Sequence, residues 1–457
     1  MNLKNFGRTL TMATLLATFG ASAADYSVRL LTLDPGHFHA GLVQKLMYPQ
    51  VDPVVHVYAP AGAELEDHLK RVESFNTRPE NPTHWQTKTR VGSDFLNQMV
   101  QEKAGNVVVI SGNNLRKTEY IDRSIAAGFN VLADKPMVIT PDGFGPLCRD
   151  FTLARERKVL LYDIMTERFE ITTILQRELA QQSEVFGHFI TGTPANPAVY
   201  TESIHHYSKE VAGKPLVRPA WFFDMKQQGE AIPDVGTHLV DLVQWGCFPE
   251  QTLDYRKDVK VLSANRWATP INPAQFKKVT GLDSYPETLK SAVDSQGILQ
   301  VYSCGDVTWR LKGIHAQVKV IWNFEAPAGA KDMHTSTMRG TKANLLIRQG
   351  AEQKYAPTLY VEPAGNGAAP DFEKYLTSAV KALAVKYPGI GVQASGKLWQ
   401  ITIPEKYVLG HEAHFSQVTE NYLKFLALGK LPEWEVPNMI TKYYVTTEAY
   451  RLSHLKK

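Results

Sequence analysis

The sequence predicts an α/β protein in two parts: an N-terminal parallel sheet, then a C-terminal α+β domain with a large, mostly antiparallel open sheet. Three observations lead to this prediction. The 457 residues exceed what one hydrophobic core usually holds. Strand-like and helix-like stretches alternate in the first third, which is typical of a parallel sheet covered by helices. Beyond it, long alternating runs dominate, so we place the domains at residues 24–150 and 151–457.

The elements of the first domain follow from apolar runs and helical periodicity. Near-continuous apolar runs suit strands that are buried on both faces. The expected strands are Val28–Leu33, Val54–Tyr58, Val107–Ser111, Val131–Ala133 and, further along, Val159–Tyr162. The expected helices are Ala40–Met47, Ala63–Val72, Lys117–Ala127 and Gly143–Arg157.

The second domain alternates apolar and polar residues, as antiparallel strands with one buried face do. Gly-, Asn- and Pro-containing turns separate these runs. The expected strands include Leu299–Ser303, Ala316–Trp322, Ala343–Arg348 and Trp399–Thr402. The expected helices are Ile171–Gln181, Gly236–Trp245, Asp371–Lys386 and His411–Leu428.

Residues 1–23 read as a signal peptide. Lys4 and Arg8 precede a short apolar run, and Ala21-Ser22-Ala23 fits the small-residue cleavage rule. We therefore expect cleavage after Ala23 and a periplasmic or secreted protein, with a cytosolic N-terminus or an uncleaved anchor as the alternatives. No later stretch reaches about 20 apolar residues, so no membrane association is expected after cleavage. The formal charge of +4 favours no nucleic-acid partner, and no metal site is expected.

The stretch DVGTHLVD, residues 234–241, is the strongest candidate for chemistry. On one helix Asp234, His238 and Asp241 would share a face. A carboxylate one turn from an imidazole can orient its tautomer, which would let His238 take a proton from an alcohol. The alternative is that Asp234 caps the helix and His238 is a core residue.

Two turns follow predicted parallel strands at their carboxyl ends, where open α/β sheets bind ligands. Asp134-Lys135 follows one strand, and a lysine there can hydrogen-bond a substrate hydroxyl and favour its alkoxide character. Ser111-Gly112-Asn113-Asn114 ends another, and its small and amide side chains suit close approach of a cofactor. Taken singly, each could also be an ordinary solvated turn.

The loop after the first strand, DPGHFH at residues 34–39, departs from the dinucleotide fingerprint G-x-G-x-x-G. Gly36 keeps the middle position, where backbone must approach a pyrophosphate. Asp34 in the first position would repel phosphate unless its side chain is bonded locally. His37 and His39 could donate hydrogen bonds to the pyrophosphate. The expected cofactor-binding residues are Asp34, Gly36, His37, Phe38, His39, Ser111, Gly112, Asn114, Asp134 and Lys135.

These motifs, in this order, resemble those of the glucose–fructose oxidoreductase / inositol dehydrogenase / MocA (Gfo/Idh/MocA) family, whose members read E-K-P, R-F and D-[IV]-G-x-H-x-x-D. The resemblance covers residues 26–245 and 414–428 and points to a branch with an enlarged C-terminal domain. It implies a Rossmann-type first domain, a homo-oligomer, and hydride transfer between NAD or NADP and a sugar or polyol hydroxyl. It implies catalytic roles for Lys135, Asp234 and His238.

Aromatic and polar residues just before DVGTHLVD suggest a sugar site, because sugars bind through stacking and hydrogen bonds. The expected substrate residues are His205, His206, Tyr207, Trp221 and, in the family's R-F position, Arg168. A surface strand with packed aromatics is the alternative. The second strand ends in Tyr58-Ala59-Pro60 without the acid that usually holds the adenosine ribose, so NAD and NADP both stay open.

The sequence therefore predicts an exported nicotinamide-dependent oxidoreductase acting on a hydroxyl of a sugar or glycoside. A periplasm has no recycled nicotinamide pool, so we expect a tightly held, self-regenerating cofactor. One alternative is a redox-cycling glycosidase that uses transient oxidation at C3 and elimination. Another is a non-catalytic protein that has lost the cofactor and binds sugar or a partner protein.

Overall fold

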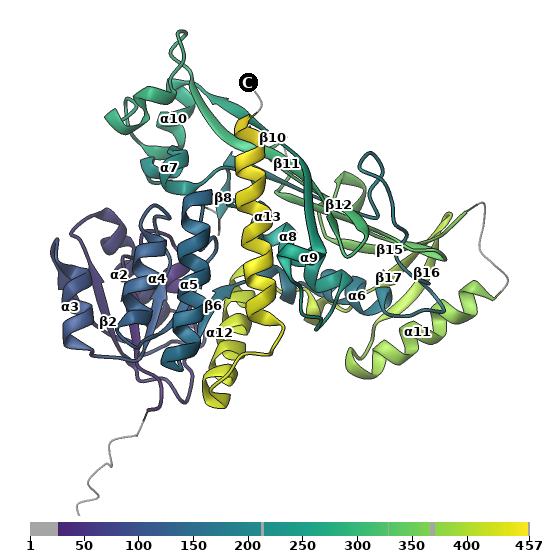
Figure 1. Ribbon diagram of the computed structural model, residues 1–457, viewed down its shortest axis with the longest axis horizontal. Helices are drawn as coiled ribbons and strands as arrows, with labels where there is room; N and C mark the ends of the chain where they lie inside the picture. Colours follow the sequence, from purple (N-terminus) through teal and green to yellow (C-terminus); the bar gives the residue numbers. More distant parts are fainter. Residues whose placement is uncertain (1–25, 212–213, 328, 366–370, 456–457) are drawn as a thin grey trace, which may run out of the picture.

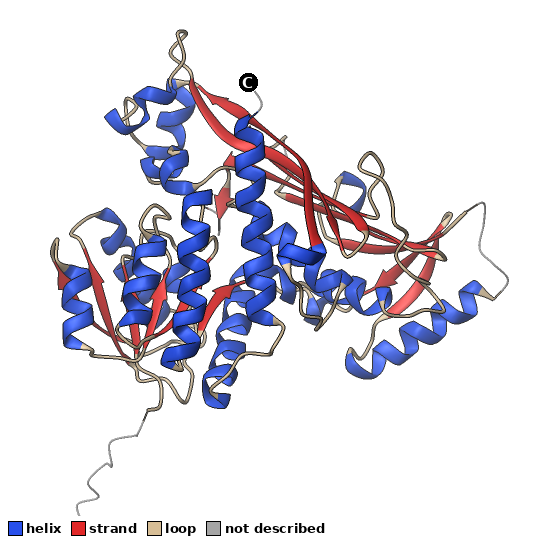
Figure 2. Cartoon of the chain, in the orientation of Figure 1, coloured by secondary structure: helices blue, strands red, loops and turns tan. Residues whose placement is uncertain are grey.

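Two sheets, side by side, form the framework of the molecule (Figure 1). The computed structural model describes residues 26–211, 214–327, 329–365 and 371–455. The expected signal peptide lies outside these residues. Figure 2 shows the short parallel strands of the first sheet and the long strands of the second, which extend away from it.

The first sheet has six parallel strands in the order β3-β2-β1-β4-β5-β6, which is the Rossmann order and confirms the expected fold class. Its core strands are almost fully buried, as their apolar runs require. The strands are β1 (Leu30–Leu33), β2 (Val54–Ala59), β3 (Gln86–Val91), β4 (Val107–Ile110), β5 (Asn130–Asp134) and β6 (Leu161–Ile164).

Four longer helices cover this sheet: α2 (Ala63–Thr77), α3 (Phe95–Glu102), α4 (Lys117–Ala126) and α5 (Pro141–Arg157). The sheet runs past residue 150, because that position lies within α5 and β6 follows it. The helix expected at 40–47 is only the four-residue α1 (His39–Leu42). Gly41, a poor helix former, lies in its middle, and the aliphatic stem of Arg71 occupies the place of a side chain there.

The second sheet has nine strands in the order β10-β11-β12-β7-β13-β14-β15-β17-β16. Only β12 and β7 pair in parallel, so the sheet is mostly antiparallel as expected. Its strands are β7 (Val199–Ser208), β10 (Val259–Ile271), β11 (Leu299–Leu311), β12 (Ile314–Glu325), β13 (Met333–Arg339), β14 (Ala343–Arg348), β15 (Thr358–Pro363), β16 (Gly391–Ser395) and β17 (Leu398–Thr402). A separate small ribbon pairs β8 (Glu210–Val211) with β9 (Lys214–Pro215).

Helices of the second domain pack on this sheet and on its connections. α6 (Ile171–Ala180) and α8 (Gly236–Cys247) lie against each other and against sheet strands. The remaining helices are α7 (Met225–Gln228), α9 (Tyr255–Asp258), α10 (Pro273–Thr280) and α11 (Phe372–Lys386). None of the described helices is long and apolar enough to cross a membrane.

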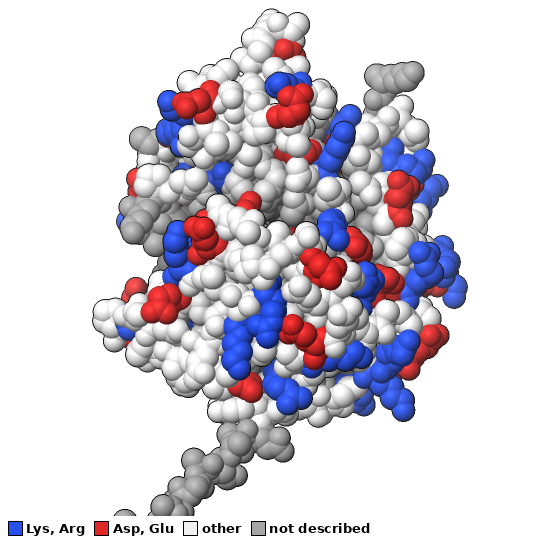
Figure 3. All heavy atoms as spheres, turned by 90° about the vertical axis from the view of Figure 1, so that its left-hand side faces the viewer, with Lys and Arg blue, Asp and Glu red and all other residues white. Residues whose placement is uncertain are grey.

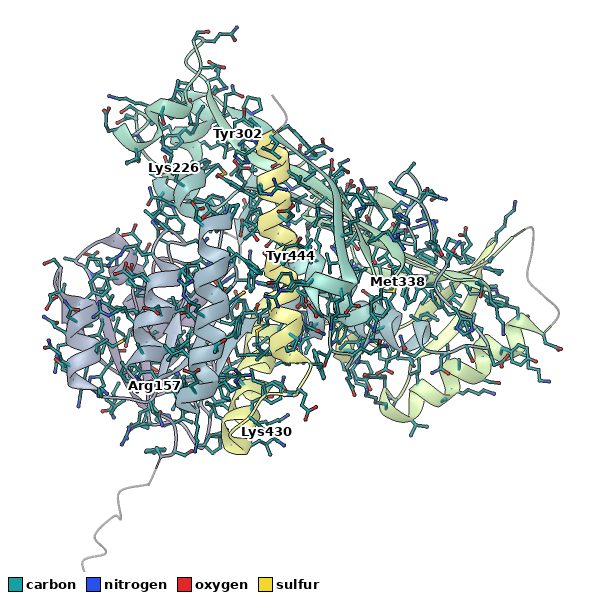
Figure 4. The ribbon with its side chains drawn as sticks, in the orientation of Figure 1. Arg157, Lys226, Tyr302, Met338, Lys430 and Tyr444 are labelled. Carbon is teal, nitrogen blue, oxygen red and sulfur yellow. The ribbon has the colours of Figure 1, made fainter. Side chains whose placement is uncertain are left out.

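The last two helices return to the first domain. α12 (His411–Leu428) and α13 (Glu435–Leu455) place Phe415, Tyr422 and Tyr443 in the core beneath the parallel sheet. In Figure 1, α13 runs between the two domains, where it contacts α5, α8 and β10. Figure 4 marks Tyr444 on this helix, whose ring packs against Phe144 and Tyr255. On the first-domain side of the molecule, acidic and basic side chains are interspersed (Figure 3).

Candidate functional site

The loop after β1 opens with an aspartate in left-handed backbone conformation. Asp34 has φ 48°, a region that glycine usually occupies and that aspartate tolerates better than most residues. Its Oδ2 accepts a hydrogen bond from the Tyr120 hydroxyl at 2.7 Å. Burial raises the pKa of this carboxyl, with Tyr120 acting in the opposite direction. The Asp34 carboxylate is therefore bonded by a tyrosine 86 residues further along the chain rather than locally, through a residue that no spacing singled out.

The loops after β1 and β4 touch through their glycines. A Cβ on Gly112 would clash with the carbonyl oxygen of Asp34, and one on Gly36 would lie 3.5 Å from the Gly112 Cα. The Gly36 amide donates to Asp34, and the His37 amide donates to the Ser111 carbonyl at 3.3 Å. Close backbone approach at the switch point of the sheet is thus built into both loops.

Two histidines of the first loop lie next to the carboxylate at the end of β5. His39 Nδ1 is 2.9 Å from Asp134 Oδ2, and His37 Nδ1 is 3.9 Å from the same oxygen. The Ser111 hydroxyl also donates to it at 2.9 Å. Burial lowers the pKa of His39 to about 4, against the opposing effect of Asp134, so this ring is neutral near pH 7. His39 is therefore engaged with Asp134, whereas the sequence assigned it to a pyrophosphate.

A buried lysine that no sequence motif indicated, Lys117, holds the backbone of the Asp134-Lys135 turn. Lys117 Nζ donates to the Asp134 carbonyl oxygen at 2.9 Å, and its side chain is almost fully buried. Burial lowers the pKa of Lys117 to about 8. The backbone of the Asp134-Lys135 turn is thereby fixed to α4.

Lys135 and Asp234 meet across the two domains. Lys135 Nζ donates to Asp234 Oδ1 at 2.7 Å, and Gln228 Nε2 donates to Asp234 Oδ2 at 2.9 Å. The expectation that Asp234 orients His238 is wrong in this structure, because the Asp234 carboxylate bonds Lys135 and Gln228 and His238 Nδ1 has no partner among the described residues. Asp234 instead positions the lysine.

His238 keeps a free nitrogen. Its Nδ1 is buried and has no hydrogen-bond partner among the described residues. Burial, and then the charge of Lys135, lower the pKa of His238 to about 3. The imidazole is therefore neutral near pH 7.

Two further residues that no sequence motif indicated, His411 and Glu167, extend the site from His39. His411, the first residue of α12, places Nε2 3.4 Å from His39 Nε2. Its Nδ1 lies 3.4 Å from Glu167 Oε1, in the short 3₁₀ helix Thr166–Phe169. These residues are far apart in the sequence, so no motif could have joined them.

The amide-rich turn after β4 fixes the second domain rather than facing a ligand. Asn114 Nδ2 donates to the Gln228 carbonyl at 2.7 Å, and Asn113 Nδ2 donates to the Gln227 side chain at 2.5 Å. Asn114 therefore clamps α7 through its amide donor, and since its Oδ1 has no partner among the described residues, its binding of cofactor stays a prediction. Ser111 and Gly112 remain at the crevice.

The expected substrate residues divide into two groups. Trp221 lies over the first loop, with its Cζ2 3.7 Å from the place of a Gly36 Cβ. His205 is partly exposed and stacks on Trp322. His206 and Tyr207 are 2% and 1% exposed, so the prediction that they contact substrate is wrong for this conformation. Tyr207 packs on Phe223 and Trp322, whereas the His206 ring, on the opposite face of β7, places Nδ1 3.1 Å from Asp332 Oδ1.

Arg168, which was also expected to contact substrate, is engaged elsewhere in the structure. Its Nε and Nη2 donate to the two carboxylate oxygens of Asp241 at 2.6 and 2.7 Å. Its Nη1 donates to Glu435 at 2.9 Å. The guanidinium is buried among these carboxylates and links three segments of the fold, which leaves it no access to a ligand.

Comparison with known proteins identifies the lineage. Residues 175–454 match the family described as "Putative oxidoreductase C terminal domain". The crystal structure of a protein described as an oxidoreductase from Parabacteroides merdae ATCC 43184 is 52% identical, with a TM-score of 0.93. The match covers 94% of this chain and 98% of that one. The chain belongs to the Gfo/Idh/MocA-like oxidoreductases.

More distant structures share the fold of this Gfo/Idh/MocA-like chain. GenD2 from gentamicin A biosynthesis, in complex with NAD, is 15% identical over 94% of this chain and 95% of that one, with a TM-score of 0.57. Levoglucosan dehydrogenase, in complex with NADH and levoglucosan, is 13% identical over 94% and 97%, with a TM-score of 0.58. No curated protein matches the sequence.

A nicotinamide dinucleotide is the cofactor that this Gfo/Idh/MocA-like fold implies, and the central residues fit it. The closely packed glycines line the switch-point crevice, and Asp34 directs its carboxylate to Tyr120. Two departures persist. α1 is too short to offer a helix dipole to a pyrophosphate, and β2 ends at Ala59 without an acid for the ribose.

Proposed function

We propose that the chain is an NAD(P)-dependent oxidoreductase that acts on a hydroxyl of a carbohydrate. The observation that carries this proposal is the contact of Lys135 with Asp234 at 2.7 Å, close to the partner-free Nδ1 of His238. A fixed cation and a neutral proton acceptor at one place are what alcohol oxidation requires.

The residues of the chain would handle the proton and the developing charge. Bound nicotinamide would supply the C4 atom that exchanges hydride with the sugar carbon. Lys135 would bind the hydroxyl oxygen and stabilise its alkoxide character. His238 would take the hydroxyl proton on its imidazole ring, so that the C–OH becomes C=O as the proton leaves to the imidazole and the hydride leaves to the nicotinamide. In the reverse direction His238 would return the proton.

Cofactor residues follow from the crevice. The backbone at Gly36 and Gly112, the His37 side chain and Lys135 would hold the central part of the cofactor. For the 2′-phosphate of NADP, Arg71 is the nearest cationic candidate. Its guanidinium carbon lies 5.5 Å from the Phe38 ring centre, whereas Lys70 pairs with Glu66. Arg71 and the absence of an acid at the end of β2 favour NADP over NAD.

Export and tight cofactor retention belong to the same proposal. The N-terminal basic, apolar and small-residue pattern supports export. An exported enzyme lacks a nicotinamide pool, so a bound cofactor would have to be regenerated on the protein by a second carbohydrate or by return of the hydride. Mass determination of the N-terminus of periplasmic protein tests cleavage after Ala23.

One experiment tests the central claim. Untagged full-length protein is denatured and the released small molecules are analysed by mass spectrometry, and apo protein is titrated with NAD(H) and NADP(H). We expect nucleotide to be released or bound. A panel of sugars and glycosides should then change the near-ultraviolet absorbance of the bound nicotinamide.

Variants separate the enzyme from a binding protein. His238→Ala should remove the sugar-dependent absorbance change while nucleotide still binds, and His84→Ala, an exposed histidine, should behave as the wild type. If the protein neither releases nor binds nucleotide, the redox function fails and a carbohydrate- or partner-binding role replaces it.

A further inference from the structure

Two imidazoles and a carboxylate converge at the carboxyl ends of β1 and β5. One ligand atom from each of His37, His39 and Asp134 lies within 4.8 Å of the other two. The Nδ1 atoms of His39 and His37 are 2.9 and 3.9 Å from Asp134 Oδ2. Ligand atoms bound tetrahedrally to zinc at about 2.0–2.2 Å lie roughly 3.3–3.5 Å apart, so the observed distances bracket that spacing.

We propose that His37, His39 and Asp134 bind a divalent transition-metal ion, with zinc as the best fit. Two imidazoles and one carboxylate favour zinc or another transition metal over magnesium or calcium, which prefer oxygen donors. Three protein ligands leave a position open for water or another oxygen ligand. None of its ligands serves as the acid, the base or the alkoxide-stabilising cation of the proposed hydride transfer, but His37 is shared with the proposed cofactor site, so a bound ion would lie against the central part of the cofactor.

The hydrogen bonds around the cluster support a metal at Nδ1 of His39. The nitrogens of His39 and His411 form a chain from Asp134 to Glu167, with contacts of 2.9, 3.4 and 3.4 Å. If all three contacts were hydrogen bonds, the two rings together would need three N–H groups, but two neutral rings carry only two. One additional proton or one metal ion would complete such a chain.

A metal ion completes it without a charged imidazole. With the metal on His39 Nδ1, the His39 Nε2–H donates to His411 Nε2. The His411 Nδ1–H then donates to Glu167. Each ring is neutral and each nitrogen has a partner. A histidine ligand whose other nitrogen is held by a hydrogen-bonded partner is the arrangement that protein metal sites favour.

The carboxylate and its turn are held in place from two sides. The Ser111 hydroxyl donates to Asp134 Oδ2, and Lys117 Nζ donates to the backbone carbonyl of Asp134. Asp134 is 4% exposed and His39 8%, so both are fixed by packing, while His37 is more open. The open side of the cluster therefore lies at His37, toward which an entering ion and its water would approach.

Metal analysis of the holo protein tests the proposal. Untagged full-length protein is purified without chelator, and its metals are measured by plasma mass spectrometry. After treatment with chelator, apo protein is titrated with Zn²⁺ and with Co²⁺ alone, the latter by its visible absorption. We expect about one equivalent of tightly bound ion and a Co²⁺ spectrum of low coordination number.

Matched variants make the result specific. His37→Ala and His39→Ala should each weaken Zn²⁺ binding at least 100-fold, His411→Ala about 10-fold, and the exposed His84→Ala not at all. Circular dichroism checks that each variant is folded. His37→Ala is the most informative substitution, because His37 is the least buried ligand and its removal should disturb folding least. Undiminished binding in a folded His37→Ala variant, or no Zn²⁺ or Co²⁺ binding by wild type, overturns the proposal.

Discussion

Two charged clusters lie at the junction of the domains, and they are built differently. In the first, which we call the interdomain ion network, Arg168 and Lys442 neutralise Asp163, Asp241 and Glu435. Lys442 is fully buried, with its Nζ 2.7 Å from Asp163 and 3.0 Å from Asp241. Every charged group there contacts an opposite charge, so the cluster has no group to offer a ligand.

The second cluster, at the carboxyl ends of β1, β4 and β5, is incomplete by comparison. His238 has a nitrogen without a partner, and the ring nitrogens of His39 and His411 need one more proton or ion. The DVGTHLVD stretch serves both clusters, because Asp234 binds Lys135 whereas Asp241 joins the ion network. The two clusters therefore differ in pairing: every charge of the ion network has an opposite partner, whereas the second cluster keeps an imidazole nitrogen without one.

Lys442→Met should have the largest effect, because it leaves Asp163 and Asp241 buried with too little positive charge. We expect a loss of about 3–5 kcal/mol in the free energy of unfolding. Urea unfolding measures this loss. Lys374→Met on the exposed face of α11 is the control and should change the free energy by less than about 0.5 kcal/mol. Equal effects of the two substitutions would remove the ion network from the account of stability.

Lys135→Met tests whether the second cluster serves catalysis, as the ion network serves stability. The substitution removes the cation that would stabilise the alkoxide, so kcat/KM for an active carbohydrate should fall about 10³-fold, or roughly 4 kcal/mol. The free energy of unfolding should also fall, but by less than for Lys442→Met, because the Lys135 and Asp234 side chains are 11% and 10% exposed whereas Lys442 is fully buried. Steady-state kinetics and urea unfolding measure the two quantities. A variant that loses stability but keeps kcat/KM contradicts the assignment.

The two aspartates of DVGTHLVD give a matched pair. Asp234→Asn should lower kcat about 10²-fold, because the amide no longer fixes the Lys135 ammonium, and should lower the free energy of unfolding less than Asp241→Asn, because Asp234 has one charged partner and Asp241 has two. Asp241→Asn should lower the free energy of unfolding by about 2–3 kcal/mol and leave kcat within a few-fold. Steady-state kinetics and urea unfolding of both variants should show that Asp234→Asn mainly lowers kcat, whereas Asp241→Asn mainly lowers the free energy of unfolding.

Asp150→Asn should have the smallest effect of these substitutions. Its sign is opposite to that of Asp241→Asn, because it should stabilise the protein. Burial, and then the neighbouring Asp122, raise the pKa of Asp150 to about 7. The unfolded pKa is near 4, so Asp150 costs no stability below pH 4, and the cost grows until pH 7. Asp150→Asn should therefore stabilise the protein by about 2 kcal/mol at pH 8 and have no effect at pH 4. Thermal unfolding at both pH values measures this, and stabilisation that is the same at both would refute the raised pKa.

The sequence predicted the fold where a single pattern determines an element. The apolar runs at β1, β4 and β5 identify buried parallel strands without further information. β3 (QTKTRV) was missed because this edge strand is mostly exposed and polar. α13 was missed because it is enclosed by both domains, so buried polar residues such as Thr441 and Lys442 obscure its helical period.

The site was predictable to the extent that its parts follow strand ends. Asp34, Ser111 and Asp134 could be grouped because parallel strands end at one edge of a sheet. The partners of these residues could not be predicted. His411 reaches His39 only through the folding of α12 onto the first domain, and Asp234 meets Lys135 only through the contact of the two domains.

The return of α12 and α13 to the first domain has a consequence for the order of folding. Tyr422 and Tyr443 belong to the core of a domain whose first strand begins at Leu30. During synthesis the Rossmann sheet must therefore wait, with part of its apolar surface uncovered, until almost the whole chain has left the ribosome. A polypeptide that completes its first domain last remains unfolded late, which is the state in which a chain can be threaded through a translocation pore.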